Sequence, residues 1–67
     1  MMTKDEARRA VEAELQSRKL TKPMTLDQLN IFCEEMYKRL QFKSEGERLA
    51  NIIKWADGWQ SKNLPSN

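Results

Sequence analysis

The sequence predicts an all-α fold, a small three-helix arrangement in a single domain spanning residues 1–67. Apolar residues recur at the spacing of a helix in three segments, and each segment begins with a threonine or serine followed three residues later by Glu or Gln. Short polar or proline-containing breaks separate the segments. We therefore expect helices over about 3–19, 25–41 and 45–62, and a flexible tail over 63–67.

The first predicted helix, 3–19, begins at a capping box formed by Thr3 and Glu6. Its apolar face is a narrow seam of Ala7, Val11 and Leu15. Most of the remaining surface carries opposite charges one turn apart, and each such pair stabilises a helix by about 0.2 to 0.5 kcal/mol. These pairs are Asp5 with Arg9, Arg8 with Glu12, and Glu14 with Arg18. Because the seam is narrow, we expect this helix to be the least firmly docked of the three.

The second predicted helix, 25–41, carries the longest apolar repeat in the chain, and the rest of the fold is expected to pack against it. Pro23 ends the preceding segment, and Thr25 with Gln28 supplies a second capping box. The apolar stripe consists of Leu26, Leu29, Cys33, Met36 and Leu40. Ile31 points roughly opposite to this stripe, among charged residues. On the exposed side, Glu34 is spaced to pair with Lys38, and Glu35 with Arg39.

The third predicted helix, 45–62, follows a third capping box formed by Ser44 and Glu47. Its inner face consists of Leu49, Ile52, Ile53, Ala56 and Trp59, with Trp55 at one edge. Gly58 is a candidate for an early end of the helix. Since only about three residues connect this helix to the preceding one, the two are expected to form an antiparallel hairpin.

Composition argues against several classes of function. The chain has no histidine and a single cysteine, Cys33, so it lacks the commonest general base and cannot assemble a thiolate zinc cluster. Neither a glycine-rich phosphate loop nor a calcium-binding loop pattern is present, and most carboxylates are spaced to pair with a Lys or Arg. We therefore expect no enzyme activity, no metal and no cofactor.

An excess of large apolar residues points to a partner. Ile31, Phe42 and Trp55 lie at or beyond the edges of the apolar stripes, and aromatic residues often dominate the energetics of interfaces. We expect these three residues to contact another protein or a second copy of the chain. The predicted function is a non-enzymatic protein-interaction module of the inhibitor or adaptor type. The purely structural alternative for Trp55 is that it only covers the rim of the core.

An alternative function is nucleic-acid binding through the basic residues of the first helix and its exit. These residues are Arg8, Arg9, Arg18, Lys19 and Lys22. Against it, carboxylates are interspersed among them, and the net charge of the chain is only +2. The third helix also begins with the acidic sequence SEGE, where a recognition helix would approach phosphates.

Cellular location is predicted from the absence of an apolar segment of about 18 residues and of a secretory leader pattern. We expect a cytoplasmic protein with no membrane partner and no small-molecule substrate.

Overall fold

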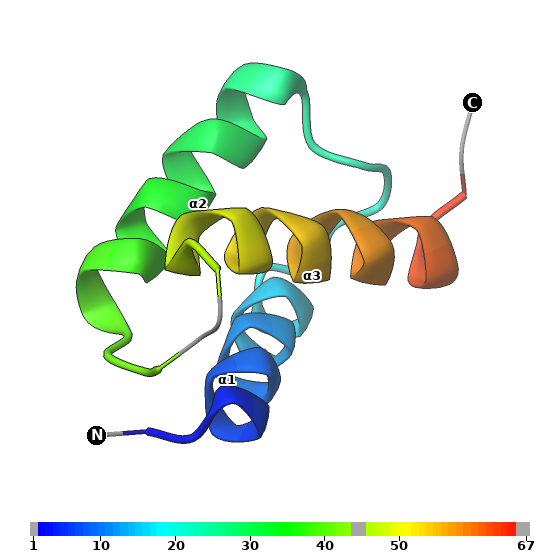
Figure 1. Ribbon diagram of the computed structural model, residues 1–67. Coiled ribbons are helices and arrows are strands. Elements are labelled where there is room, and N and C mark those ends of the chain that lie inside the picture. The colour runs from blue at the N-terminus through cyan, green and yellow to red at the C-terminus, as the bar shows by residue number, and fades with distance from the viewer. Residues whose placement is uncertain (1, 44–45, 66–67) are drawn as a thin grey trace.

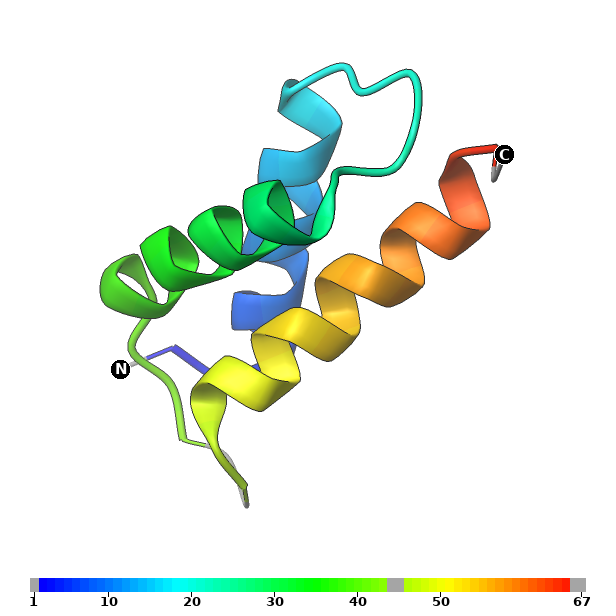
Figure 2. The same ribbon diagram turned by 90° about the horizontal axis from the view of Figure 1, so that it is seen from above.

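The computed structural model describes residues 2–43 and 46–65 and confirms the all-α fold (Figure 1). The three helices are α1 (Lys4–Ser17), α2 (Leu26–Arg39) and α3 (Arg48–Asn63). α2 and α3 pack together and run in roughly opposite directions (Figure 2), and the first view shows that their axes cross at a wide angle. α1 packs against α3 from below in the view of Figure 1.

The N-termini of α1 and α2 carry two of the three predicted capping boxes. The backbone nitrogen of Thr3 donates to Oε1 of Glu6 at 2.9 Å, and the backbone nitrogen of Glu6 donates to Oγ1 of Thr3 at 3.1 Å. The reciprocal bonds between Thr25 and Gln28 measure 3.0 and 3.2 Å. Each box satisfies backbone donors that have no partner inside the helix. Both helix starts are therefore predictable from the sequence.

The start of α3 differs from the prediction. The helix begins at Arg48, with Glu47 as a cap that makes no side-chain hydrogen bond. Ser44 and Glu45, at the predicted start of this helix, lie outside the described residues. Instead, the Arg48 guanidinium donates to the carbonyl oxygen of Leu40 at 3.2 Å, so the first residue of α3 satisfies a carbonyl just beyond the end of α2. Arg48 also lies over the ring of Tyr37, at 4.5 Å.

The end of α3 is also later than Gly58. This glycine does not have a positive φ, so the helix continues through it to Asn63. Of the predicted tail 63–67, Asn63 is the last helical residue and Leu64 is the C-cap, whose N–H bonds to the carbonyl oxygen of Gln60 at 2.9 Å.

The core draws on all three helices. Its buried apolar residues are Ala7, Val11, Leu15, Phe32, Cys33, Met36, Leu40, Phe42, Ile52 and Ala56. The seam of α1 is 0% exposed throughout, so the expectation of a loosely docked first helix is not supported. On α2, Leu26 belongs to the predicted stripe but is 73% exposed, whereas the flanking Phe32 is buried. Leu26 is the first residue of α2 and does not belong to the set of side chains that pack against the core.

Polar contacts fix the connections to this core. The Met24 N–H donates to Oε1 of Gln60 at 2.7 Å, and Gln60 is a polar residue buried among the apolar ones. The Met2 N–H donates to the carbonyl oxygen of Gln41 at 2.9 Å, next to an isolated bridge between Met2 and Phe42. The α1–α2 loop is thus tied to α3, and the N-terminal residues are tied to the α2–α3 connection.

Four charged side chains join α1 to α2. Arg18 approaches Glu35 at 3.4 Å, and Arg39 approaches Glu14 at 3.7 Å. The sequence pairs Glu35 with Arg39 along one helix, but the structure directs both across to α1. Glu14 and Arg18 also form their predicted pair at 3.8 Å. Such exposed pairs contribute little individually to stability.

In the described part of the chain, none of the helices combines the length and the apolar character needed to cross a bilayer.

Candidate functional site

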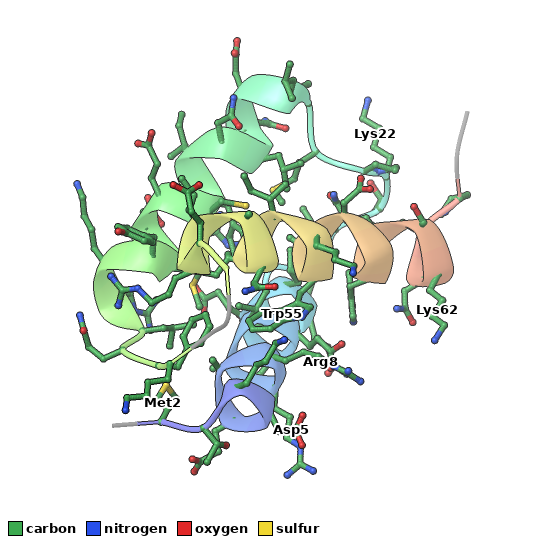
Figure 3. The ribbon with its side chains drawn as sticks, in the orientation of Figure 1. Met2, Asp5, Arg8, Lys22, Trp55 and Lys62 are labelled. Atoms are coloured by element: carbon green, nitrogen blue, oxygen red, sulfur yellow. The ribbon has the colours of Figure 1, made fainter. Side chains whose placement is uncertain are left out.

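A shallow groove of about 730 Å³ lies between α1 and α3. It is open to solvent and combines aromatic, cationic and small side chains. Its lining residues are Arg8, Glu12, Lys54, Trp55, Gly58, Trp59, Ser61, Lys62 and Asn63. Figure 3 shows Arg8 of α1 and Trp55 of α3 side by side, with Lys62 further along α3. We call this feature the α1–α3 groove.

The two tryptophans supply the apolar surface of the α1–α3 groove. Trp55 and Trp59 are four residues apart on α3 and therefore lie on the same face. Both are half-buried and pack against the core. The Trp55 ring contacts Phe42, with ring centroids 5.4 Å apart. The indoles are thus held in place from within while part of each remains open to the groove.

The charge of the groove is positive. Arg8, Lys54 and Lys62 contribute three cations, against one lining carboxylate, Glu12. Glu12 lies 3.7 Å from Arg8 in an ion pair. Among residues 2–43 and 46–65, Lys54 and Lys62 form no ion pair. Their ammonium groups are therefore available to an acidic ligand.

Gly58 lies on the groove wall between the two lysines. A Cβ at this position would meet no atom within 4 Å, so a larger side chain would extend into open space. Glycine inside a helix costs about 0.5 to 1 kcal/mol relative to alanine. Gly58 therefore lowers the stability of the helix but leaves the groove free of a side chain at this position.

The three predicted partner-binding residues have different locations. Trp55 lies in the groove and Ile31 is 60% exposed on α2, but Phe42 is only 3% exposed. The sequence places Phe42 at the surface, but it is buried because the chain after α2 turns back beneath Trp55 and pairs with Met2. In this conformation Phe42 supports the groove from inside and offers no surface to a partner.

The remaining groove residues are not identified by the sequence patterns. Periodicity assigns Trp59 to the core, and it does not single out Lys54, Gly58 or Lys62. One signal could have found most of them: two tryptophans one turn apart on a helix, with a lysine directly before the first and a glycine directly before the second. The contribution of Arg8 from α1 depends on tertiary packing and has no signature in the sequence.

The basic residues of the nucleic-acid alternative do not come together. Arg8 lines the α1–α3 groove, whereas Arg18 pairs with two glutamates and lies 4.8 Å from the Phe32 ring. Lys19 and Lys22 line a separate depression along the α1–α2 loop. The structure therefore separates Arg8 from Lys19 and Lys22, and Arg9 is exposed on α1 without lining either depression.

Two groups in the described chain have displaced pKa values, and neither lines the groove. Burial raises the pKa of the Cys33 thiol to about 11. A hydrogen bond from the Thr3 backbone lowers the pKa of Glu6. Within the described residues, no three His, Cys, Asp or Glu side chains are grouped as a metal site would require.

A comparison with protein-family models finds no match, and neither do comparisons with curated proteins and with solved structures.

Proposed function

We propose that the chain is a non-enzymatic protein-interaction module, of the inhibitor or adaptor type, which recognises its partner through the α1–α3 groove. The observation that carries this proposal is the pair of half-buried indoles flanked by three cations. Tryptophan and arginine are enriched among residues that dominate binding energy. The proposed setting is the cytoplasm, and no catalytic group is assigned.

Support for a protein partner comes from the mixed character of the groove. Its indoles offer apolar surface for a side chain of the partner, and its three cations favour carboxylates around that side chain. A single-stranded nucleic acid would also stack on indoles, but it needs a basic track along its backbone. Here Arg18, Lys19 and Lys22 lie away from the groove. Nucleic-acid binding therefore remains the second candidate.

The sharpest test is to fill the groove without disturbing the core. Trp55 is unsuitable for this purpose because it also contacts Phe42. Gly58→Gln adds a polar side chain in open space and removes a helical glycine, so we expect the fold to be retained or stabilised. Tagged wild-type chain and Gly58→Gln would be used to capture proteins from lysate of the source cells, with and without nuclease.

We expect wild type to capture a specific protein whether or not the lysate is treated with nuclease. Gly58→Gln should fail to capture that protein. The matched control is Ala13→Gln on α1, an exposed position that does not line the groove. Equal capture by Gly58→Gln and wild type would show that the groove is not the binding site. Capture that disappears with nuclease would establish the nucleic-acid alternative instead.

A further inference from the structure

The outer face of α2 carries an exposed isoleucine between two carboxylates, and the exposed Lys38 lies one turn beyond the second of them on the same face. Ile31 is 60% exposed, and Asp27 and Glu34 lie one turn before and one turn after it on the same face. Within the described residues, neither carboxylate forms an ion pair. We call this feature the Ile31 face. It is open to solvent and available to another molecule.

The Ile31 face and the α1–α3 groove have complementary chemistry. One presents an aliphatic side chain between two carboxylates, and the other presents two indoles between two lysines. At 1.5 Å per residue, Asp27 and Glu34 are separated by about 10.5 Å along α2, and Lys54 and Lys62 by about 12 Å along α3. An α2 helix lying along the groove can therefore place both carboxylates near lysines while Ile31 contacts the indoles.

We infer that the occupant of the α1–α3 groove is the Ile31 face of a second copy of this chain. This inference rests on the proposed function, whose groove it uses, and adds the identity of the partner. The attraction comes from desolvation of Ile31 against Trp55 and Trp59, with the charges setting the register. Arg8, on the opposite wall, is already ion-paired with Glu12, so Lys54 and Lys62 supply the attraction to the carboxylates.

The contact is heterologous, because the two surfaces belong to different elements. α2 contributes no residue to the groove, so each chain offers one groove and one Ile31 face in different places. Copies joined in this way form a closed ring, of which a reciprocal two-fold dimer with two such contacts is the smallest, or an open head-to-tail chain. The average mass should therefore rise with concentration, to two chains for the reciprocal dimer and beyond two for a larger ring or an open chain.

Two single variants test this arrangement. Gly58→Glu fills the groove and repels the acidic face, and Ile31→Glu replaces the apolar anchor at an exposed position. Both substitutions are at sites without core contacts, and circular dichroism checks that each folds. The average mass would be measured by sedimentation from about 10 μM to about 1 mM, a range that covers weak association.

Wild type is expected to gain mass with concentration, and each variant alone is expected to remain at the mass of one chain. A one-to-one mixture of the variants should give a complex of two chains that does not grow further. In that mixture the Ile31 face of Gly58→Glu meets the intact groove of Ile31→Glu, while the other two surfaces repel.

A wild type that remains monomeric over the whole range would overturn the inference, as would variants that associate like wild type or a mixture that stays monomeric. The proposed function fails differently. If the wild type is monomeric but lysate capture still depends on Gly58, the groove binds a foreign protein and only the self-association is lost.

Discussion

Gln60 illustrates at the residue scale how one polar side chain holds a connection in place. It is 3% exposed, and its Oε1 accepts the Met24 N–H at 2.7 Å. This bond crosses from α3 to the segment that leads into α2, where no regular hydrogen-bond ladder exists. A buried donor without an acceptor costs more than the bond itself contributes, so the segment depends on this single oxygen.

Gln60→Met should destabilise the protein by about 1 to 3 kcal/mol, because methionine retains most of the volume but cannot accept the Met24 N–H. Urea unfolding would report the loss as a lower midpoint with an unchanged slope. Ser61→Ala, at the exposed neighbouring position, is the control and should stay within about 0.5 kcal/mol of wild type. If Gln60→Met left the protein as stable as wild type, the assigned role of Gln60 would be wrong.

Cys33 is a buried thiol whose chemistry follows from its surroundings. It is 1% exposed, and burial raises its pKa to about 11 from an ordinary 9.0. Because the folded state favours the protonated thiol, this contribution to stability is complete below about pH 9 and is lost as the pH rises toward 11.

The thiol should therefore react slowly with a disulfide reagent at about pH 8 while the chain is folded. In concentrated urea the same chain should react at the rate of a free thiol, which serves as the internal control. Equal rates in the folded and unfolded protein would show that Cys33 is accessible, contrary to its packing.

At the scale of helices, local capping signals are more informative than the apolar stripes. The boxes at Thr3 and Thr25 can be identified from the sequence because hydroxyl and acceptor side chains three residues apart satisfy the helix start locally. The burial of individual apolar residues is less predictable: Leu26 shares the stripe but is exposed, and Phe42 is buried in the core after α2 ends. Both outcomes depend on tertiary contacts that periodicity does not encode.

Glu6 should make the stability of α1 depend on pH. The Thr3 backbone hydrogen bond, followed by that of the Thr3 side chain, lowers the Glu6 pKa below 4.5. The ionised form therefore stabilises the folded state above about pH 4.5, and this contribution is lost as the pH falls through the lowered folded-state pKa.

Glu6→Gln retains an acceptor without the charge, so it should be less stable than wild type at neutral pH, with the difference vanishing in acid. Thermal unfolding followed by circular dichroism across this range would measure the difference. In a Thr3→Ala background, which lacks the side-chain part of the box, the effect of Glu6→Gln should be smaller. A wild-type advantage that persists in acid would contradict the capping interpretation.

For the molecule as a whole, the surface is large for the mass. The chain exposes 5023 Å², whereas a typical monomer of 7.9 kDa exposes about 4,400 Å². Its extents of 36 × 19 × 17 Å agree with this, because an elongated shape has more surface. A chain of 67 residues buries a modest core, so covering the groove would add a substantial fraction to its stability.

Self-association should appear as a melting temperature that rises with protein concentration. Stabilisation by about 1 kcal/mol shifts the midpoint of a domain of this size by roughly 4 to 8 °C. We expect such a rise for wild type and a constant midpoint for Ile31→Glu. A midpoint independent of concentration in wild type would argue against association of the folded chains.

We propose that a protein surface occupies the groove between α1 and α3. A photo-crosslinking residue at Ser61, exposed on the groove rim, measures this contact directly, with the same residue at Ala13 as the control. We expect crosslinked protein from position 61 in the source cells and little from position 13. Crosslinks from position 13 alone, or crosslinks from position 61 to nucleic acid only, would contradict it.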